Sequence, residues 1–414
     1  MERAVGLLGI GVLLLLAWLV STNRRGVSWG PILSALGLQF GIALIALRTP
    51  LGAWLFGAAT DLALAFLGYA DRGIDFVFGR WPDEILGADG KPLRLPFVFA
   101  VRVLPIIIFM SSIFSVLYHF GVLQHVVNGL ARGMRRLLRI SGAESLAAIG
   151  NIFLGMTEAP LLVRPYVERM TRSELFCVMT VGLATVAGTV LVAYMSMVGG
   201  EYAGHLIAAS FMSAPAAIAV AKLMIPEAET PETLGGARVP VERKHANAID
   251  AAASGAADGL RLALNIGAML IAFVALIYML DDLLGTLGGW VGIEQLSFAS
   301  LLGFVLAPLA WLLGVPWSDA FQVGEMLGVK TVLNEFLAYQ MLADARASLD
   351  PRSVVIASYA LCGFANFGSL AILLGGLGGI APSRRSDIAR DGLRAIYAGS
   401  IATFLTGAIA GLLL

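Results

Sequence analysis

Long apolar runs separated by short polar loops dominate the chain of 414 residues. A helix needs roughly 20 residues to cross the hydrocarbon core of a bilayer. On that rule we predict transmembrane helices at 4–21, 31–47, 97–118, 174–195, 204–224, 259–280, 353–374 and 393–414. The pattern therefore predicts an all-α polytopic membrane protein with eight transmembrane helices.

Four further segments differ from these runs. Residues 144–168 and 319–342 are apolar but carry glycine and a polar cluster in the middle, as re-entrant helical hairpins do. Charged residues interrupt 51–79 too often for a span, so we predict an amphipathic helix at the membrane interface. Segment 296–313 is apolar enough to cross, but a crossing there would move the later basic loops to the other side. We therefore predict a helix along the membrane surface.

Basic residues gather in alternate loops, and their positions set the predicted orientation. With eight crossings these loops share the cytoplasmic side, and both termini lie on the outer face of a bacterial inner membrane. The residues concerned are Arg24, Arg25, Arg132, Arg135, Arg136, Arg139, Arg164, Arg169, Arg172, Arg238, Arg243, Lys244, Arg384, Arg385, Arg390 and Arg394.

The same order of segments occurs twice. A span, a connecting helix, a broken hairpin and two spans follow one another from residue 97 to 224, and again from 259 to 414. The connecting helices are predicted at 121–140 and 296–313. Because the first hairpin starts inside and the second outside, the two units are inverted repeats, a common build of secondary transporters.

Composition agrees with a lipid environment and excludes several classes of function. Hydrophobic residues make up 58% of the chain and charged residues 14%, against about 25% charged in a soluble domain. Acidic and basic residues balance at 28 each, which gives no indication of a nucleic-acid partner. The sequence has no complete motif of a hydrolase, metalloprotease or phosphate-binding enzyme, so we expect no enzyme activity.

The middle of the first hairpin combines helix-breaking and helix-capping residues with a carboxylate. Gly155 permits a break, and Thr157 is a suitable N-cap for the helix that resumes. Pro160 suits the first turn of that helix, and Glu158 lies between them. The pattern predicts the N-terminus of a half-helix inside the membrane, with Glu158 beside it.

The second hairpin offers a counterpart, in which Asn334 directly precedes Glu335. An ionisable residue at membrane depth is costly and by default marks a functional site. Two glutamates at equivalent places of inverted repeats therefore predict a binding site near the middle of the membrane.

Two predicted spans also contain breaks, at 182–189 and 362–369, where glycines alternate with small hydroxyl and amide side chains. Such breaks free backbone carbonyls and supply neutral oxygen ligands, suited to a sodium ion or to sugar hydroxyls. Alternatively, Thr185, Thr189 and Ser369 bond back to their own helices and the glycines only let helices approach closely. Because four such segments occur together, we favour a binding site.

These motifs resemble those of the concentrative nucleoside transporter family, over nearly the whole chain. They are Gly155-x-Thr157-Glu158-Ala159-Pro160, Lys330-Thr-Val-x-Asn334-Glu335-Phe336 and Cys362-Gly-Phe364-Ala-Asn366. The resemblance implies symport of a nucleoside with sodium by a homotrimer, in which a transport domain moves as an elevator against a scaffold. The implied division is a scaffold at 1–140 and 259–313, a transport domain at 141–225 and 314–414, and a cytoplasmic linker with an interfacial helix at 226–258.

Carried over position by position, the resemblance implies two sets of binding residues. Thr157 and Glu158 would contact the base of the nucleoside. Glu335, Asn366 and Ser369 would contact its ribose. Val190 and Phe364 would line the pocket. Sodium would meet the side chains of Asn151 and Thr185 and the backbone carbonyls of Asn151, Leu154, Thr185 and Val186. Met156 departs from the pattern, since relatives usually carry glutamine beside the base. A thioether cannot form a bidentate hydrogen bond, so we expect an altered base preference.

Other readings stay open on the sequence alone. A proton could replace sodium, because a membrane glutamate can titrate. An elevator symporter for another small polar solute, such as an amino acid or dicarboxylate, would need a buried cation, whereas the expected pocket offers two glutamates and no arginine. A channel has no need of blind hairpins with buried carboxylates. An intramembrane enzyme would need a metal cluster or an activated nucleophile.

Overall fold

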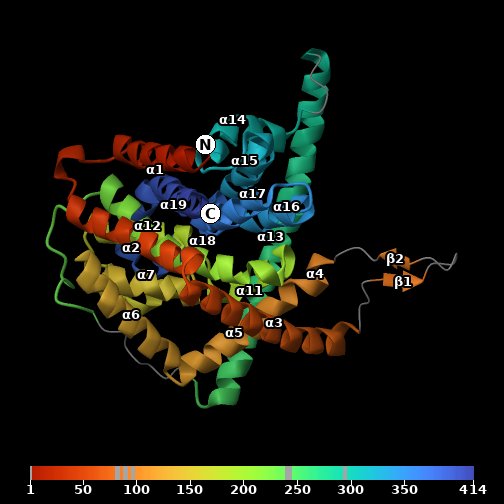
Figure 1. Ribbon diagram of the computed structural model, residues 1–414. Helices are drawn as coiled ribbons and strands as arrows, with labels where there is room; N and C mark the ends of the chain where they lie inside the picture. Colours follow the sequence, from red (N-terminus) through yellow and green to blue (C-terminus); the bar gives the residue numbers. More distant parts are fainter. Residues whose placement is uncertain (1, 80–83, 87–91, 95–97, 238–244, 292–295) are drawn as a thin grey trace.

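The computed structural model describes residues 2–79, 84–86, 92–94, 98–237, 245–291 and 296–414, and nearly all of them are helical (Figure 1). The first part contains α1 (Glu2–Leu19), η1 (Arg24–Gly26), α2 (Trp29–Arg48), α3 (Pro50–Phe78), the short antiparallel strands β1 (Glu84–Leu86) and β2 (Pro92–Arg94), α4 (Phe99–Arg102), α5 (Leu104–His119) and α6 (Val122–Leu138). The middle part contains α7 (Gly142–Leu154), α8 (Ala159–Leu162), α9 (Arg164–Val167), α10 (Arg172–Ala184), α11 (Gly188–Val198), η2 (Gly200–Tyr202) and α12 (Ala203–Met224). The last part contains α13 (Ala248–Val291), α14 (Phe298–Leu312), α15 (Trp317–Val332), α16 (Glu335–Ala345), α17 (Pro351–Leu361), α18 (Phe367–Ile380), η3 (Pro382–Arg384) and α19 (Arg385–Leu413).

Three apolar segments form the buried core of the molecule. The most apolar windows of Arg172–Val198, Gly200–Met224 and Pro382–Leu413 are 94%, 89% and 89% buried. Their helices α10, α12 and α19 all pack against one another. The corresponding window of α13 is only 6% buried although it is equally apolar. A surface of that kind is stable only against lipid or another protein chain.

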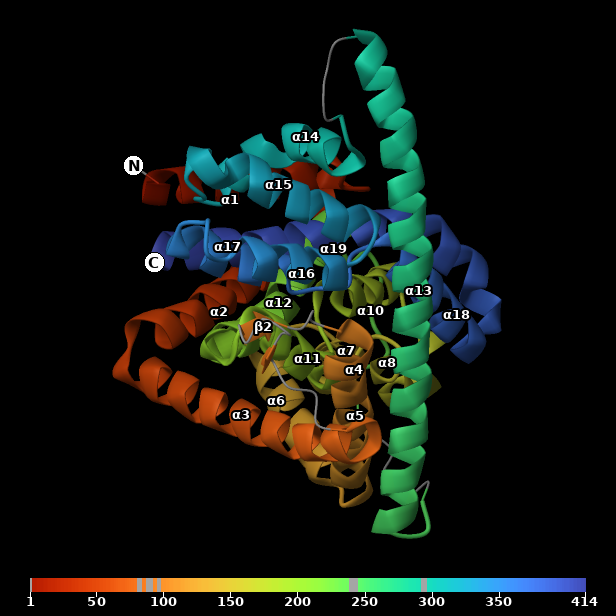
Figure 2. The ribbon, with the colours of Figure 1, turned by 90° about the vertical axis from the view of Figure 1, so that its right-hand side faces the viewer.

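Helix α13 is a single helix of 44 residues. Figure 2 shows it along one edge of the molecule, and it packs mainly against α5. The interfacial helix expected before residue 259 is the first part of this same helix, so the predicted boundary between 258 and 259 falls inside a continuous helix. The division into a linker and a scaffold part stays a prediction.

Seven of the described helices are long and apolar enough to cross a membrane, or eight if α14 and α15, bent by 119°, count as one span. They include α3, with a mean hydropathy of 1.5 in its apolar window. The sequence suggested that charged residues exclude 51–79 from spanning, but the length and composition of α3 do not exclude it. Asp71, Arg72 and Asp75 lie in the last third of α3 and leave an apolar window before them. The number of crossings stays a prediction, as does the orientation.

The helix breaks lie where the sequence predicts them. α7 ends at Leu154, α10 ends at Ala184, and the span predicted at 353–374 divides into α17 and α18. The second hairpin divides between α15 and α16, where Asn334 caps α16 by accepting the Leu337 N–H at 2.9 Å. α6 and α14 match the two expected connecting helices. The inverted relation of the two repeats stays a prediction.

The linker predicted at 226–258 is partly docked on the helical core. The backbone oxygen of Thr233 accepts the Gly142 N–H at 2.8 Å, and its hydroxyl oxygen accepts the Ala143 N–H at 3.0 Å. Arg135 donates to the Leu234 carbonyl at 2.9 Å. Residues 226–237 thus cover the beginning of α7. The basic residues Arg238, Arg243 and Lys244 lie outside the described residues.

The two broken spans cross at their breaks. A Cβ added to Gly363 would lie 2.7 Å from the Ala184 carbonyl oxygen and 2.5 Å from the Thr403 methyl group. Only glycine therefore lets the end of α17 approach the end of α10 so closely.

Replacement of Gly363 by alanine should lower the thermal midpoint of the purified protein, because overpacking of such a contact costs about 1–3 kcal/mol. Gly375→Ala in α18 is a matched control, since a Cβ there meets nothing within 4 Å. This control should be neutral or slightly stabilising. Equal midpoints for the two variants would contradict the close crossing.

Candidate functional site

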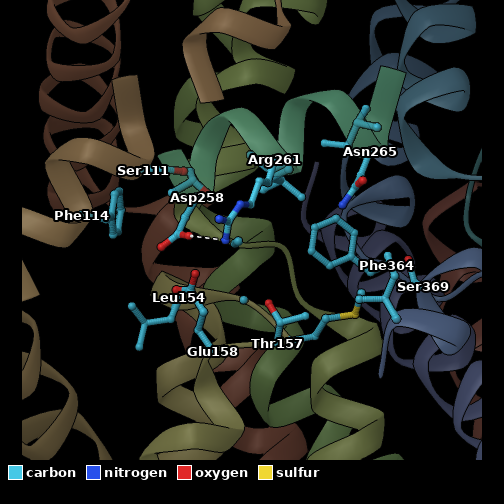
Figure 3. A pocket seen from close by; sticks show the side chains of 18 of the residues that line it. Ser111, Phe114, Leu154, Thr157, Glu158, Asp258, Arg261, Asn265, Phe364 and Ser369 are labelled. Carbon is cyan, nitrogen blue, oxygen red and sulfur yellow. Dashed lines mark ion pairs between the residues drawn. The ribbon is translucent and has the colours of Figure 1, made fainter. Parts of the chain in front are cut away.

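A cavity of about 550 Å³ lies where the helix breaks meet (Figure 3). Its size falls within the range of roughly 300–1,000 Å³ typical of small-molecule sites. All the residues that the sequence assigned to substrate binding line it, namely Met156, Thr157, Glu158, Val190, Glu335, Phe364, Asn366 and Ser369. Residues more than 200 positions apart in the chain thus surround one space.

Glu335 is a buried, hydrogen-bonded carboxylate of the cavity. It is the first residue of α16 and is only 3% exposed. Its Oε1 accepts a hydrogen bond from the Tyr194 hydroxyl at 2.8 Å, and its Oε2 accepts one from Asn366 Nδ2 at 2.9 Å. A carboxylate has about four acceptor positions, so each oxygen keeps a position for a donor on a solute.

Asn366 links this carboxylate to the second broken span. While its Nδ2 donates to Glu335, its Oδ1 accepts the Ser369 N–H at 2.8 Å and so caps α18. Both ends of the amide are therefore used, which fixes its orientation. Ser369 lies one turn further along α18 and faces the same cavity.

Lys330 lies behind this group in the last turn of α15, and its side chain is fully buried. Its Nζ donates to Thr403 Oγ1 at 2.7 Å and to the Ala360 carbonyl at 3.3 Å, and lies 5.3 Å from the centre of the Phe404 ring. These contacts tie α15 to α17 and α19 directly before the break that presents Glu335.

The first hairpin breaks differently from the sequence prediction. Gly155 has a φ of 89°, and a Cβ there would lie 2.8 Å from that of Ala187, so this break rests on the break between α10 and α11. The resumed helix α8 has only four residues and Glu158, not Thr157, at its N-cap position, without a side-chain cap. The predicted capping role of Thr157 is therefore wrong, while Pro160 does lie in the first turn.

The predicted sodium ligands lie where α7 and α10 end. Leu154 lines the cavity, whereas Asn151, Thr185 and Val186 are buried behind it. Asn151 Nδ2 donates to the Ala147 carbonyl at 3.0 Å, but its Oδ1 is buried without a hydrogen-bond partner among the described residues. The Thr185 hydroxyl donates to the Val181 carbonyl at 2.9 Å, which leaves its oxygen lone pairs available. An unpaired buried acceptor beside such a group fits a hard cation with oxygen ligands.

The sequence did not identify the opposite wall of the cavity. Asp258, Arg261 and Asn265 of α13 line it together with Ser111 and Ser115 of α5 (Figure 3). The spacing i, i+3, i+7 places the three α13 residues on one face of the helix, directly before and within its long apolar stretch, which is the signal that could have found them.

Arg261 corrects the expectation that the pocket contains no arginine. Its guanidinium lies 3.7 Å from the Asp258 carboxylate, and both side chains are exposed, at 80% and 63%. The wall therefore carries a cation together with its own counter-charge. Because Asp258 already partners this cation, the pocket still disfavours an anionic solute.

Three family models match successive parts of the chain. Residues 8–81 match "Na+ dependent nucleoside transporter N-terminus", residues 100–201 match "Nucleoside recognition", and residues 205–411 match "Na+ dependent nucleoside transporter C-terminus". The apolar helices and the solute-sized cavity between helix breaks define a multi-pass solute transporter.

Known proteins give the same result. The chain is 41% identical over 409 residues to nucleoside permease NupC of Helicobacter pylori, covering 98% of this chain and 96% of that protein. It is 42% identical to sodium/nucleoside cotransporter 1 of Rattus norvegicus, covering 100% of this chain but 64% of that longer protein. The structure of CNTnw in an inward-facing substrate-bound state superposes with a TM-score of 0.91 at 43% identity, covering 100% of this chain and 98% of the other. The chain belongs to the concentrative, Na+-dependent nucleoside transporter family.

The Tyr194→Phe variant should raise the KM for nucleoside uptake roughly tenfold, because a hydrogen bond to a charged group contributes about 1.5–3 kcal/mol. Tyr339→Phe is the matched control. Its ring stacks on Tyr194 at 4.4 Å, but its hydroxyl donates to the Ser358 carbonyl and not to Glu335. Uptake kinetics in proteoliposomes measure the difference, and an equal effect of both substitutions would show that the Glu335 contact is unimportant.

Proposed function

We propose that the protein is a sodium-coupled symporter that imports nucleosides across a bacterial inner membrane by alternating access. The observation that carries this proposal is the buried Glu335 carboxylate, oriented by Tyr194 and Asn366 and directed into a solute-sized cavity. Ribose hydroxyls are donors, and a desolvated carboxylate accepts from them strongly.

The other lining residues suit the rest of a nucleoside. Glu158 and Thr157 supply a second polar group on the opposite hairpin, where the N–H groups of a base would be met. Phe364 and Val190 supply apolar surface for the ring faces. One site with two separate acceptor groups and apolar lining favours a solute with a sugar at one end and a base at the other.

Sodium is the proposed coupling ion because its expected ligands are neutral oxygens. The described residues contain no group of three or more His, Cys, Asp or Glu side chains that could hold a metal ion. The unpaired Oδ1 of Asn151 and the hydroxyl of Thr185 lie where two helices direct their carbonyl ends. The negative end of each helix dipole also favours a cation there.

An elevator movement in a homotrimer is the proposed mechanism. The transport body would be 141–225 with 314–414, and the scaffold would comprise 1–140 and 259–313. The cavity has walls from both bodies, and the scaffold wall on α13 is held mainly by α5. Movement of one body along the other would expose the cavity to alternate sides, while the apolar outer face of α13 would contact lipid or a neighbouring protomer. Both termini would lie outside.

The test of substrate, ion and site is uptake of radiolabelled uridine and adenosine into proteoliposomes, with and without an inward sodium gradient. We expect sodium-stimulated uptake in the wild type and its loss in Glu335→Gln, which keeps the shape but removes the charge. Glu325→Gln on α15 is the control, because Glu325 lies against Gly303 outside the cavity. Uptake that is driven by external acid and does not depend on sodium would identify the proton as the coupling ion. Absence of any nucleoside uptake would overturn the proposed function.

Met156 should set the preference among bases. It lines the cavity beside Thr157 and is 7% exposed, and its thioether makes at most a weak hydrogen bond. Met156→Gln should therefore change the ranking of purine and pyrimidine nucleosides as competitors of uridine uptake. The same ranking in wild type and variant would refute a role for this position in selectivity.

A further inference from the structure

The two helices that end at the proposed sodium ligands lie side by side in the core. α7 and α10 each contain 13 residues and pack against each other. Asn151 and Leu154 lie in the last turn of α7, and Thr185 directly follows α10. A helix of that length spans about 20 Å, so the first turn of each helix is far from the ligands at its end.

The first turns of α7 and α10 are joined by one ammonium group. Lys222, in the last turn of α12, has its Nζ 2.5 Å from Glu144 Oε1 in α7. The same Nζ donates to Ser173 Oγ in α10 at 3.0 Å and lies 3.3 Å from Glu227 of the docked linker. The Ser173 hydroxyl in turn donates to the Ile225 carbonyl at 2.7 Å. Three helix ends therefore meet at a single buried cation.

Capping boxes make this junction rigid. Both helices start with one, formed by Ser141 with Glu144 and by Thr171 with Glu174. The Oε2 of Glu144 accepts the Ser141 N–H at 3.0 Å while its Oε1 faces Lys222, so the carboxylate cannot turn away without breaking its cap. The side chains of Lys222 and Glu144 are only 9% and 1% exposed. Removal of one partner of such a buried pair is costly.

Small side chains let α7 lie close to its neighbours. Six of its 13 residues, in the sequence GAESLAAIGNIFL, are glycine, alanine or serine, and such residues allow helices to approach closely. The polar junction at the start of α7 adds directional contacts to this packing.

We propose that Lys222 is a positioning residue for sodium: it fixes the axial register of α7 against α10, and with it the spacing of the ligands at their far ends. Lys222 touches neither the ion nor the nucleoside. The inference rests on the proposed sodium-coupled function. A change of register separates Asn151 from Thr185 and also shifts Met156, which follows α7 closely. Glu335 and Asn366 belong to α16 and the start of α18 and are not on the shifted helix.

The test compares Lys222→Met, Glu144→Gln and the double variant with the wild type. Sodium binding is measured by the rise of the thermal midpoint with sodium concentration in the purified protein, a readout that does not require transport. The half-saturating sodium concentration should rise roughly tenfold, because ligands whose spacing is no longer fixed are less preorganised for the ion. Saturating sodium selects the register in which the ligands meet, so the uridine KM measured there should stay within about twofold of the wild type. Arg169→Met, which removes an exposed ion pair with Glu232 at 3.0 Å, is the control and should bind sodium like the wild type.

The double variant separates positioning from stability. It leaves neither Lys222 nor Glu144 as a buried charge without its partner, so its thermal midpoint without sodium should recover relative to the single variants. Its sodium half-saturation should nevertheless stay raised, because the restraint is still absent. Wild-type sodium affinity in the double variant would overturn the positioning role, even if a single variant fails to fold. No sodium response in the wild type would instead overturn the sodium-coupled function, and the inference with it.

Discussion

A helix that breaks in apolar surroundings leaves backbone N–H and carbonyl groups without partners, and each such group costs free energy unless it is paired. This protein gathers its breaks at 155–158, 185–187, 333–334 and 362–366 around one cavity. Glycine lets the breaks touch, as Gly363 does against the carbonyl of Ala184. The place where the backbone is least satisfied by its own helices is therefore also the place that can bind a polar solute and a cation.

Asparagine side chains cap helices at two of these breaks and supply a free acceptor near a third. Asn334 and Asn366 each accept an N–H of the helix that follows, which is the ordinary N-cap role. Asn366 also donates to Glu335, so the cap of α18 orients the carboxylate at the start of α16. Asn151, by contrast, lies inside α7 and keeps its Oδ1 unpaired. The same residue type thus completes the fold at two positions and leaves an acceptor available at a third.

The two walls of the cavity differ in how firmly they are held. Glu335 and Asn366 are buried and hydrogen-bonded to each other, at the starts of α16 and α18. Asp258 and Arg261 are exposed on α13, whose apolar surface is hardly covered by the rest of the chain. A hydrogen-bonded binding wall facing a separate, mainly apolar helix is compatible with the movement of two bodies proposed above.

The sequence by itself determined the helical class, the positions of the breaks and the polar residues beside them. Each of these depends on local properties: the length of an apolar run, the conformational freedom of Gly155, the capping ability of Asn334. Local patterns were also the source of the errors. Thr157 is a good capping residue, but α8 begins after Glu158. The charges of α3 were counted over the whole segment, although most lie toward its end.

Only the tertiary structure decided which residues meet across the chain. Tyr194 and Asn366 share Glu335 across sequence separations of 141 and 31 residues. Lys222 meets Glu144, and the polar face of α13 closes the cavity opposite the hairpins. Helical periodicity tells which face of a helix is polar but not which helix lies opposite that face, because this depends on how all the helices pack together. Local sequence patterns therefore identify the residues of the site, whereas the packing of α5, α10, α12 and α13 decides which other residues they contact.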